Sequence, residues 1–82
     1  MEVRGMGEAK VVITFETTTQ AMAWERACKE HGLPGRLIPM PVVISANCGL
    51  AWLASPEDRD VLLRWAEELA LRYDQIVEME MG

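Results

Sequence analysis

The chain has 82 residues, half of them apolar, and 13 acidic against 8 basic side chains give a formal net charge of −5 at pH 7. This length supports one domain with a core that needs no disulfide. The scattered cations form no basic stripe for nucleic acid, no apolar run approaches the ~18 residues that cross a bilayer, and no signal-peptide layout is present. Two cysteines and one histidine are too few for a four-ligand zinc site. We expect a soluble, cytoplasmic protein without metal or cofactor.

The N-terminal part is expected to contain a short lead-in and then a central strand. Residues 1–8 carry two glycines and no periodic pattern, which is typical of a loosely held segment. Residues 9–16 are rich in β-branched and aromatic side chains and are apolar on both faces in the middle. We therefore place a single domain over residues 9–82 and its first strand over residues 9–16.

A helix is predicted over about residues 18–31. Thr17 and Gln20 have the spacing of a capping box, and Gly32 supplies a C-terminal stop. The apolar side of this helix is formed by four residues at helical spacing, Ala21, Trp24, Ala27 and Cys28. Cys28 is thus interpreted as a core residue.

Two short strands are predicted on either side of a longer connection. Residues 35–40 form the first, and Pro39 favours an edge position because proline cannot donate to a ladder. Residues 50–54 are apolar and of strand length. The connection between them carries its own pattern, which is more often functional than a plain turn.

The C-terminal part is predicted to contain a helix and a strand. Ser55 is expected to cap the helix, with Pro56 at its first position. The strand lies over residues 73–81, where Glu78 and Glu80 alternate with apolar residues, as in a strand with one wet face. The core-facing side of the helix is expected to contain Val61, Leu62, Trp65, Ala66 and Leu69.

The order β-α-β-β-α-β with right-handed crossovers predicts an α+β, ferredoxin-like sandwich, in which two helices cover one face of four antiparallel strands. In this topology the connection that contains Cys48 emerges where the first helix begins, near Thr17 and Thr18. Unpaired N–H groups and the partial positive charge of a helix start lower the pKa of a nearby thiol. Gly49 allows close backbone approach. The sequence therefore predicts a reactive cysteine at position 48.

The chain resembles the small family of selenium/sulfur carrier protein-like domains, and the resemblance covers nearly its whole length, from Lys10 to Glu80. The resemblance rests on an Ile-Thr-Phe strand, the run from Gly32 to Pro39 and a Pro-x-x-Ile-Ser-x-x-Cys-Gly signature. The signature falls on Pro41, Ile44, Ser45, Cys48 and Gly49. The resemblance implies a carrier role with Cys48 as the carrying residue.

In the hypothesis that follows, Cys48 takes a sulfur or selenium atom from a donor protein such as a cysteine desulfurase and passes it to an unidentified acceptor. Ser45, Asn47 and the Gly49 amide would hydrogen-bond the carried atom, and the helix start at Thr17 and Thr18 would stabilise its charge. A carrier of this kind need not turn over a substrate by itself.

Two other classes are weighed against the carrier. A non-catalytic binding module is the main alternative, because one sheet face lacks a helix and could pair with a partner or form a homodimer. A cysteine hydrolase needs a histidine beside the thiol, and His31, the one histidine, is expected at the opposite end of the domain. Serine at position 48 would be tolerated by a module but not by a carrier.

Overall fold

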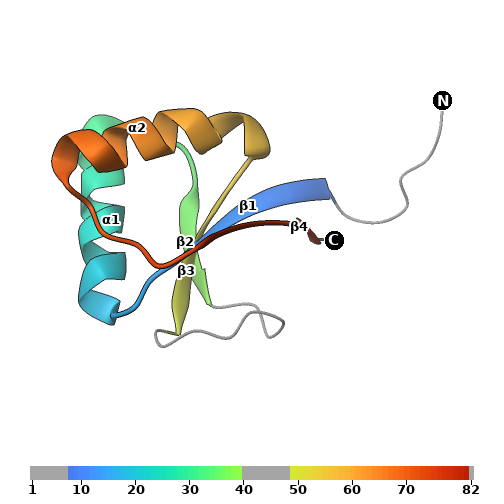
Figure 1. Cartoon of the computed structure of the whole chain (residues 1–82), viewed down its shortest axis with the longest axis horizontal. Coiled ribbons are helices and arrows are strands. Elements are labelled where there is room, and N and C mark those ends of the chain that lie inside the picture. Colours follow the sequence, from blue (N-terminus) through green and yellow to red (C-terminus); the bar gives the residue numbers. More distant parts are fainter. Residues whose placement is uncertain (1–7, 40–48, 82) are drawn as a thin grey trace, which may run out of the picture.

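The computed structural model describes residues 8–39 and 49–81. The strands form one sheet in the order β2-β3-β1-β4, and every neighbouring pair is antiparallel. Both helices lie on the same side of this twisted sheet (Figure 1). The predicted α+β class with ferredoxin-like strand order is confirmed. The elements are β1 (Glu8–Thr14), α1 (Thr18–His31), β2 (Arg36–Pro39), β3 (Leu50–Ala54), the 3-10 turn η1 (Pro56–Asp58), α2 (Arg59–Leu69) and β4 (Ile76–Met81).

The register of the sheet fixes which ends of the elements meet. Thr14, the last residue of β1, lies opposite Ala51, and Pro39 at the end of β2 lies opposite Leu50 at the start of β3. The end of β1, the end of β2 and the start of β3 therefore lie together where the strands of the sheet terminate, and α1 begins there. We call this the α1-start edge.

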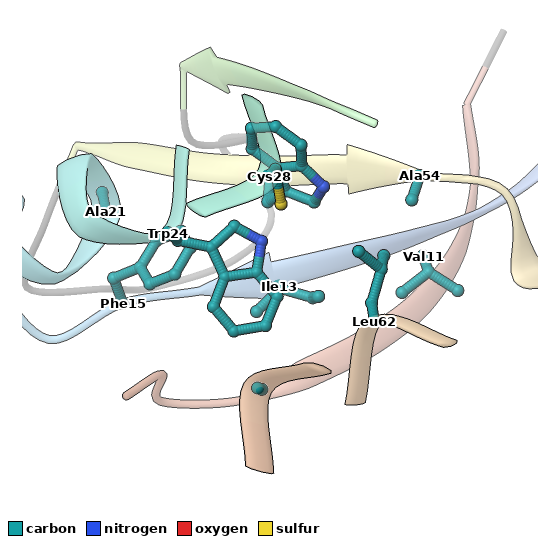
Figure 2. Close-up of a cluster of buried hydrophobic side chains, with 10 residues drawn as sticks. Val11, Ile13, Phe15, Ala21, Trp24, Cys28, Ala54 and Leu62 are labelled. Carbon is teal, nitrogen blue, oxygen red and sulfur yellow. The ribbon is translucent and has the colours of Figure 1, made fainter. Parts of the chain in front are cut away.

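The main core lies between the helices and the sheet (Figure 2). The rings of Phe15 and Trp24 meet edge to face, with centroids 5.6 Å apart, and the Tyr73 ring also meets Trp24 edge to face, with centroids 5.8 Å apart. Such aromatic pairs add to the stabilisation from burial. The buried members are Val11, Ile13, Phe15, Ala21, Trp24, Cys28, Trp52, Ala54, Leu62 and Ala66.

The predicted bounds of α1 are confirmed, and the cap explains why β1 ends early. The hydroxyl of Thr17 accepts a hydrogen bond from the Gln20 N–H at 3.1 Å, and Gly32 ends the helix in the left-handed region with φ 65°. The Gln20 side chain accepts from the N–H of Glu16, one residue before the one expected in a capping box. Because that N–H is used by the helix cap, the strand ends at Thr14 instead of continuing to Glu16.

The connection from α1 to β2 is held by an indole. Trp52 of β3 donates a hydrogen bond from Nε1 to the carbonyl oxygen of Pro34 at 3.0 Å. Gly35 lies directly against this indole with φ 110°, a conformation that other residues rarely adopt. A Cβ atom at Gly35 would overlap the Trp52 indole and lie 2.7 Å from the carbonyl oxygen of Leu53. We call this contact the Trp52 clamp.

The start of the second helix differs from the prediction. Residues 56–58 form a 3-10 turn, and the α-helix begins only at Arg59. The Ser55 side chain makes no capping hydrogen bond; its carbonyl oxygen instead accepts from the Asp58 N–H at 2.9 Å. This i to i+3 hydrogen bond gives the Asp58 N–H, at the start of the helix, a backbone acceptor in place of a side-chain cap. The predicted Ser55 side-chain cap was therefore wrong.

The buried side of α2 is narrower than predicted. Leu62 and Ala66 are buried, whereas Val61 and Leu69 each keep 36% of their surface exposed and Trp65 is half-buried. Residues four apart lie above one another on a helix, and only one such pair reaches the sheet. The expectation that all five apolar residues face the core was therefore wrong.

A β-bulge delays the start of β4 to Ile76. The Thr14 N–H donates to the Gln75 carbonyl oxygen at 2.9 Å, while the Thr14 carbonyl oxygen accepts from the Asp74 N–H at 2.7 Å. Two residues thus oppose one, and the Thr14 hydroxyl accepts from the remaining N–H of Gln75 at 3.0 Å.

The alternation of exposed glutamates with less exposed apolar residues in β4 is confirmed. The glutamates, however, lie on the side of the sheet that carries the helices, where apolar residues are usual. Glu78 and Glu80 are exposed, as predicted. Glu78 lies opposite Val11, whose side chain is in the core, so both glutamates are on the helix side of the sheet. Val77 and Met79 lie on the side without helices and are half-buried.

Candidate functional site

Only part of the predicted site lies within the described residues. Cys48, Ser45, Asn47 and Pro41 all fall within residues 40–48, outside the described ranges, so their predicted roles stay predictions. Gly49, Thr17 and Thr18 are described, and the α1-start edge is where they are found. Gly49 directly precedes Leu50 at the start of β3, and Thr17 and Thr18 begin α1.

The topological argument for this edge is confirmed for the described residues. The start of β3 pairs with the end of β2, and Ala51 lies opposite Thr14, three residues before Thr17. Gly49 is exposed, and a Cβ atom there would meet no described atom within 4 Å. Among the described residues, nothing therefore requires a glycine at position 49 by close approach.

The first turn of α1 brings an ordered set of backbone groups to the same edge. Thr17 caps the Gln20 N–H with its hydroxyl, and its carbonyl oxygen accepts from the Ala21 N–H at 3.2 Å. Thr17 and Thr18 are exposed. The Thr17 oxygen thus supports the helix start, and the partial positive charge of α1 is directed toward this edge.

Cys28, the other cysteine, is part of the core. It is 2% exposed, and its sulfur lies within the buried cluster between α1 and the sheet (Figure 2). Burial raises the pKa of the Cys28 thiol from 9.0 to about 11, because the thiolate would lose its hydration. A thiol of this kind is a poor nucleophile near neutral pH. The sequence-based interpretation of Cys28 as a core residue is confirmed.

We expect this raised pKa to appear in the pH dependence of stability. Below pH 9 the Cys28 thiol is neutral in both the folded and the unfolded chain. Between pH 9 and about 11 the unfolded chain releases the thiol proton while the folded chain keeps it. Unfolding is therefore favoured as the pH rises, by up to about 1.4 kcal/mol per pH unit for this group. Urea unfolding between pH 8 and 11 should show a steeper loss of stability for the wild type than for Cys28→Ala.

The comparison of slopes removes the contribution of the other groups that titrate in this range, since both proteins share them. Cys28→Ala starts from a lower stability because it removes buried volume, but its profile should be flatter. Parallel profiles for the two proteins would contradict the buried-thiol assignment.

His31 lies at the far end of α1, as the sequence predicted. Its ring stacks on Trp65 of α2, with centroids 4.5 Å apart. The 14 residues of α1, at ~1.5 Å each, separate it from the helix start by about 20 Å. A histidine at this distance from the α1-start edge gives no support to a cysteine-hydrolase function.

The described ranges contain neither a cluster of metal-binding side chains nor a membrane-spanning helix. Over residues 8–39 and 49–81, no three His, Cys, Asp or Glu side chains are grouped so that they could hold a metal ion. In the same ranges, no helix is long and apolar enough to cross a membrane.

Comparison with known families assigns the chain. A family model described as "Putative Se/S carrier protein-like" matches residues 10–78. The chain belongs to this family. The match to the Se/S carrier-like family spans both helices and most of the sheet, and includes the positions of both cysteines. No curated protein and no solved structure gives a significant match.

Proposed function

We propose that this Se/S carrier-like protein holds a sulfur or selenium atom on Cys48 and passes it to an acceptor protein. The observation that carries the proposal is the burial of Cys28. The family description points to chalcogen transfer, which requires an accessible thiolate. The chain has two cysteines, and Cys28 is 2% exposed with a raised pKa. Cys48 is therefore the residue to which the chemistry is assigned.

In the proposed transfer, the Cys48 thiolate attacks the terminal sulfur of a donor persulfide, R–S–SH. The new Cys48 S–S bond forms as the donor S–S bond breaks, and the donor leaves as the thiolate R–S⁻. An acceptor thiolate then attacks the terminal sulfur of Cys48–S–SH, and Cys48 leaves as the thiolate. A terminal selenium atom would follow the same path, and neither step needs an external oxidant or reductant.

The α1-start edge supports this assignment electrostatically. Gly49, the residue after Cys48, directly precedes the start of β3, at the edge where α1 begins. A helix start favours nearby negative charge by about 0.3–1 kcal/mol at exposed positions. We propose that Thr17 and Thr18 act through this helix start, and that Ser45, Asn47 and the Gly49 amide bind the carried atom.

The test is intact-protein mass spectrometry after incubation with a cysteine desulfurase and cysteine. Wild type and Cys28→Ala should both gain one sulfur that a thiol reductant removes, whereas Cys48→Ser should gain none. A parallel incubation with a selenium donor would decide the cargo. The transferred atom should then be detectable on a model acceptor thiol.

Cys28→Ala is the matched control, because it removes the other thiol and leaves Cys48 in place. Loss of the added sulfur in Cys28→Ala but not in Cys48→Ser would overturn the assignment. Absence of modification in all three proteins, together with no alkylation of Cys48 by iodoacetamide, would favour the non-catalytic module.

A further inference from the structure

The outer edge of β4 is the longest unpaired strand edge of the described sheet. The strand order places β2 and β4 at the two edges, and β4 has six residues against four in β2. Residues 8–10 of β1 pair with β4 but not with β3. The β1–β4 ribbon therefore continues beyond the rest of the sheet, toward the right in Figure 1.

The hydrogen bonds of Thr14, opposite the bulge, show which backbone groups of β4 point outward. Thr14 exchanges hydrogen bonds with residues 74–75, so its backbone N–H and C=O groups point toward β4. These groups alternate in direction along a strand, so those of Val12 and Lys10 also point toward β4. Val12 and Lys10 lie opposite Val77 and Met79, whose backbone groups therefore point toward β1. The N–H and C=O groups of the intervening residues then point away from β1. These residues are Ile76, Glu78 and Glu80.

Two glutamates on this edge carry both outward backbone groups and exposed carboxylates. Glu78 and Glu80 point to the helix side of the sheet, about 7 Å apart along the strand. Val77 and Met79 supply half-buried apolar surface on the opposite side. The edge thus offers a main-chain ladder with one acidic and one apolar face.

This charge pattern disfavours a second copy as the occupant. When two β4 strands pair antiparallel about a two-fold axis, paired residues must point to the same side. The registers that pair five residues of Ile76–Met81 place Glu78 opposite either Glu78 or Glu80 of the other copy. Like charges directly opposite destabilise a strand pair, so β4 is protected against self-pairing.

We propose that the outer edge of β4 binds an extended segment of a partner protein in which Lys or Arg alternates with apolar residues. Such a segment would add a fifth strand, with its cations opposite Glu78 and Glu80 and its apolar side chains beside Val77 and Met79. Main-chain hydrogen bonds provide affinity in this mode, and the alternating side chains provide specificity. The net charge of −5 favours the approach of a basic segment. The proposal does not depend on the chemistry of Cys48.

The test is an NMR titration of the full chain with a seven-residue, end-blocked peptide of alternating Lys and Val. The peptide should shift the amide signals of β4 and slow the exchange of the outward N–H groups of Glu78 and Glu80. The double variant Glu78→Gln/Glu80→Gln should bind about tenfold more weakly, which corresponds to about 1.4 kcal/mol for the two opposite-charge pairs together.

The matched control is Glu67→Gln/Glu68→Gln, which changes the net charge equally at two exposed residues of α2. It should bind as the wild type does, and a peptide with Glu in place of Lys should not bind. Equal weakening by both double variants, or shifts centred on the helices, would overturn the proposal by showing unspecific attraction.

Discussion

Gly35→Ala is expected to lower the free energy of unfolding by about 3–4 kcal/mol. The substitution forces a side chain into φ 110° and drives its Cβ atom into the Trp52 indole. An unfavourable backbone conformation costs about 1–2 kcal/mol and overpacking about 1–3 kcal/mol. The clash also threatens the hydrogen bond from Trp52 to Pro34. Urea unfolding followed by circular dichroism measures the change directly.

Gly32→Ala is the matched control for Gly35→Ala. Gly32 also has a positive φ, at 65°, but a Cβ atom there would meet nothing within 4 Å among the described residues. Its substitution should therefore cost only the backbone preference, about 1 kcal/mol. Equal losses for the two variants would show that the Trp52 clamp does not contribute.

Leu62→Ala is expected to cost about 2–4 kcal/mol of unfolding free energy, and Leu69→Ala less than about 1 kcal/mol. Both leucines lie on α2, but Leu62 is 1% exposed and Leu69 36%. Truncation of Leu62 leaves a cavity between α2 and the sheet, whereas Leu69 gives up only part of its contact. Chemical denaturation at neutral pH compares the two variants with the wild type.

This pair tests the narrow buried side of α2. The two substitutions change the same atoms on the same helix, so helix propensity cancels between them. If Leu69→Ala proved as costly as Leu62→Ala, the wider apolar side predicted from the sequence would be the better description.

The sequence predicted those elements whose ends depend on local chemistry. The bounds of α1 follow from Thr17 and Gly32, which fix the helix through hydrogen bonds and backbone conformation within a few residues. The start of β4 depends instead on Thr14, some sixty residues away, through a bulge. A single sequence carries no signal for such a distant pairing.

The site was predictable to a different degree. Topology alone placed the start of the third strand at the end of the sheet where the first helix begins, and the register confirms that the start of β3 lies beside the end of β1. The core role of Cys28 followed from helical spacing and is confirmed by its burial. The Trp52 clamp was not predicted, because the contact joins Gly35 to an indole seventeen residues away and neither residue is unusual by itself.

The placement of β1 has a consequence for how the chain folds during synthesis. β1 is made before the other described strands, yet one of its two neighbours is β4, which is made after them. At about 5–20 residues per second, the chain from Glu8 to Met81 takes roughly 4–15 s to make. During that time β1, whose central residues 11–13 are all apolar, lacks its second partner. Until residues 76–81 emerge, the nascent chain exposes the edge of β1, and this interval is when aggregation or chaperone binding would compete with folding.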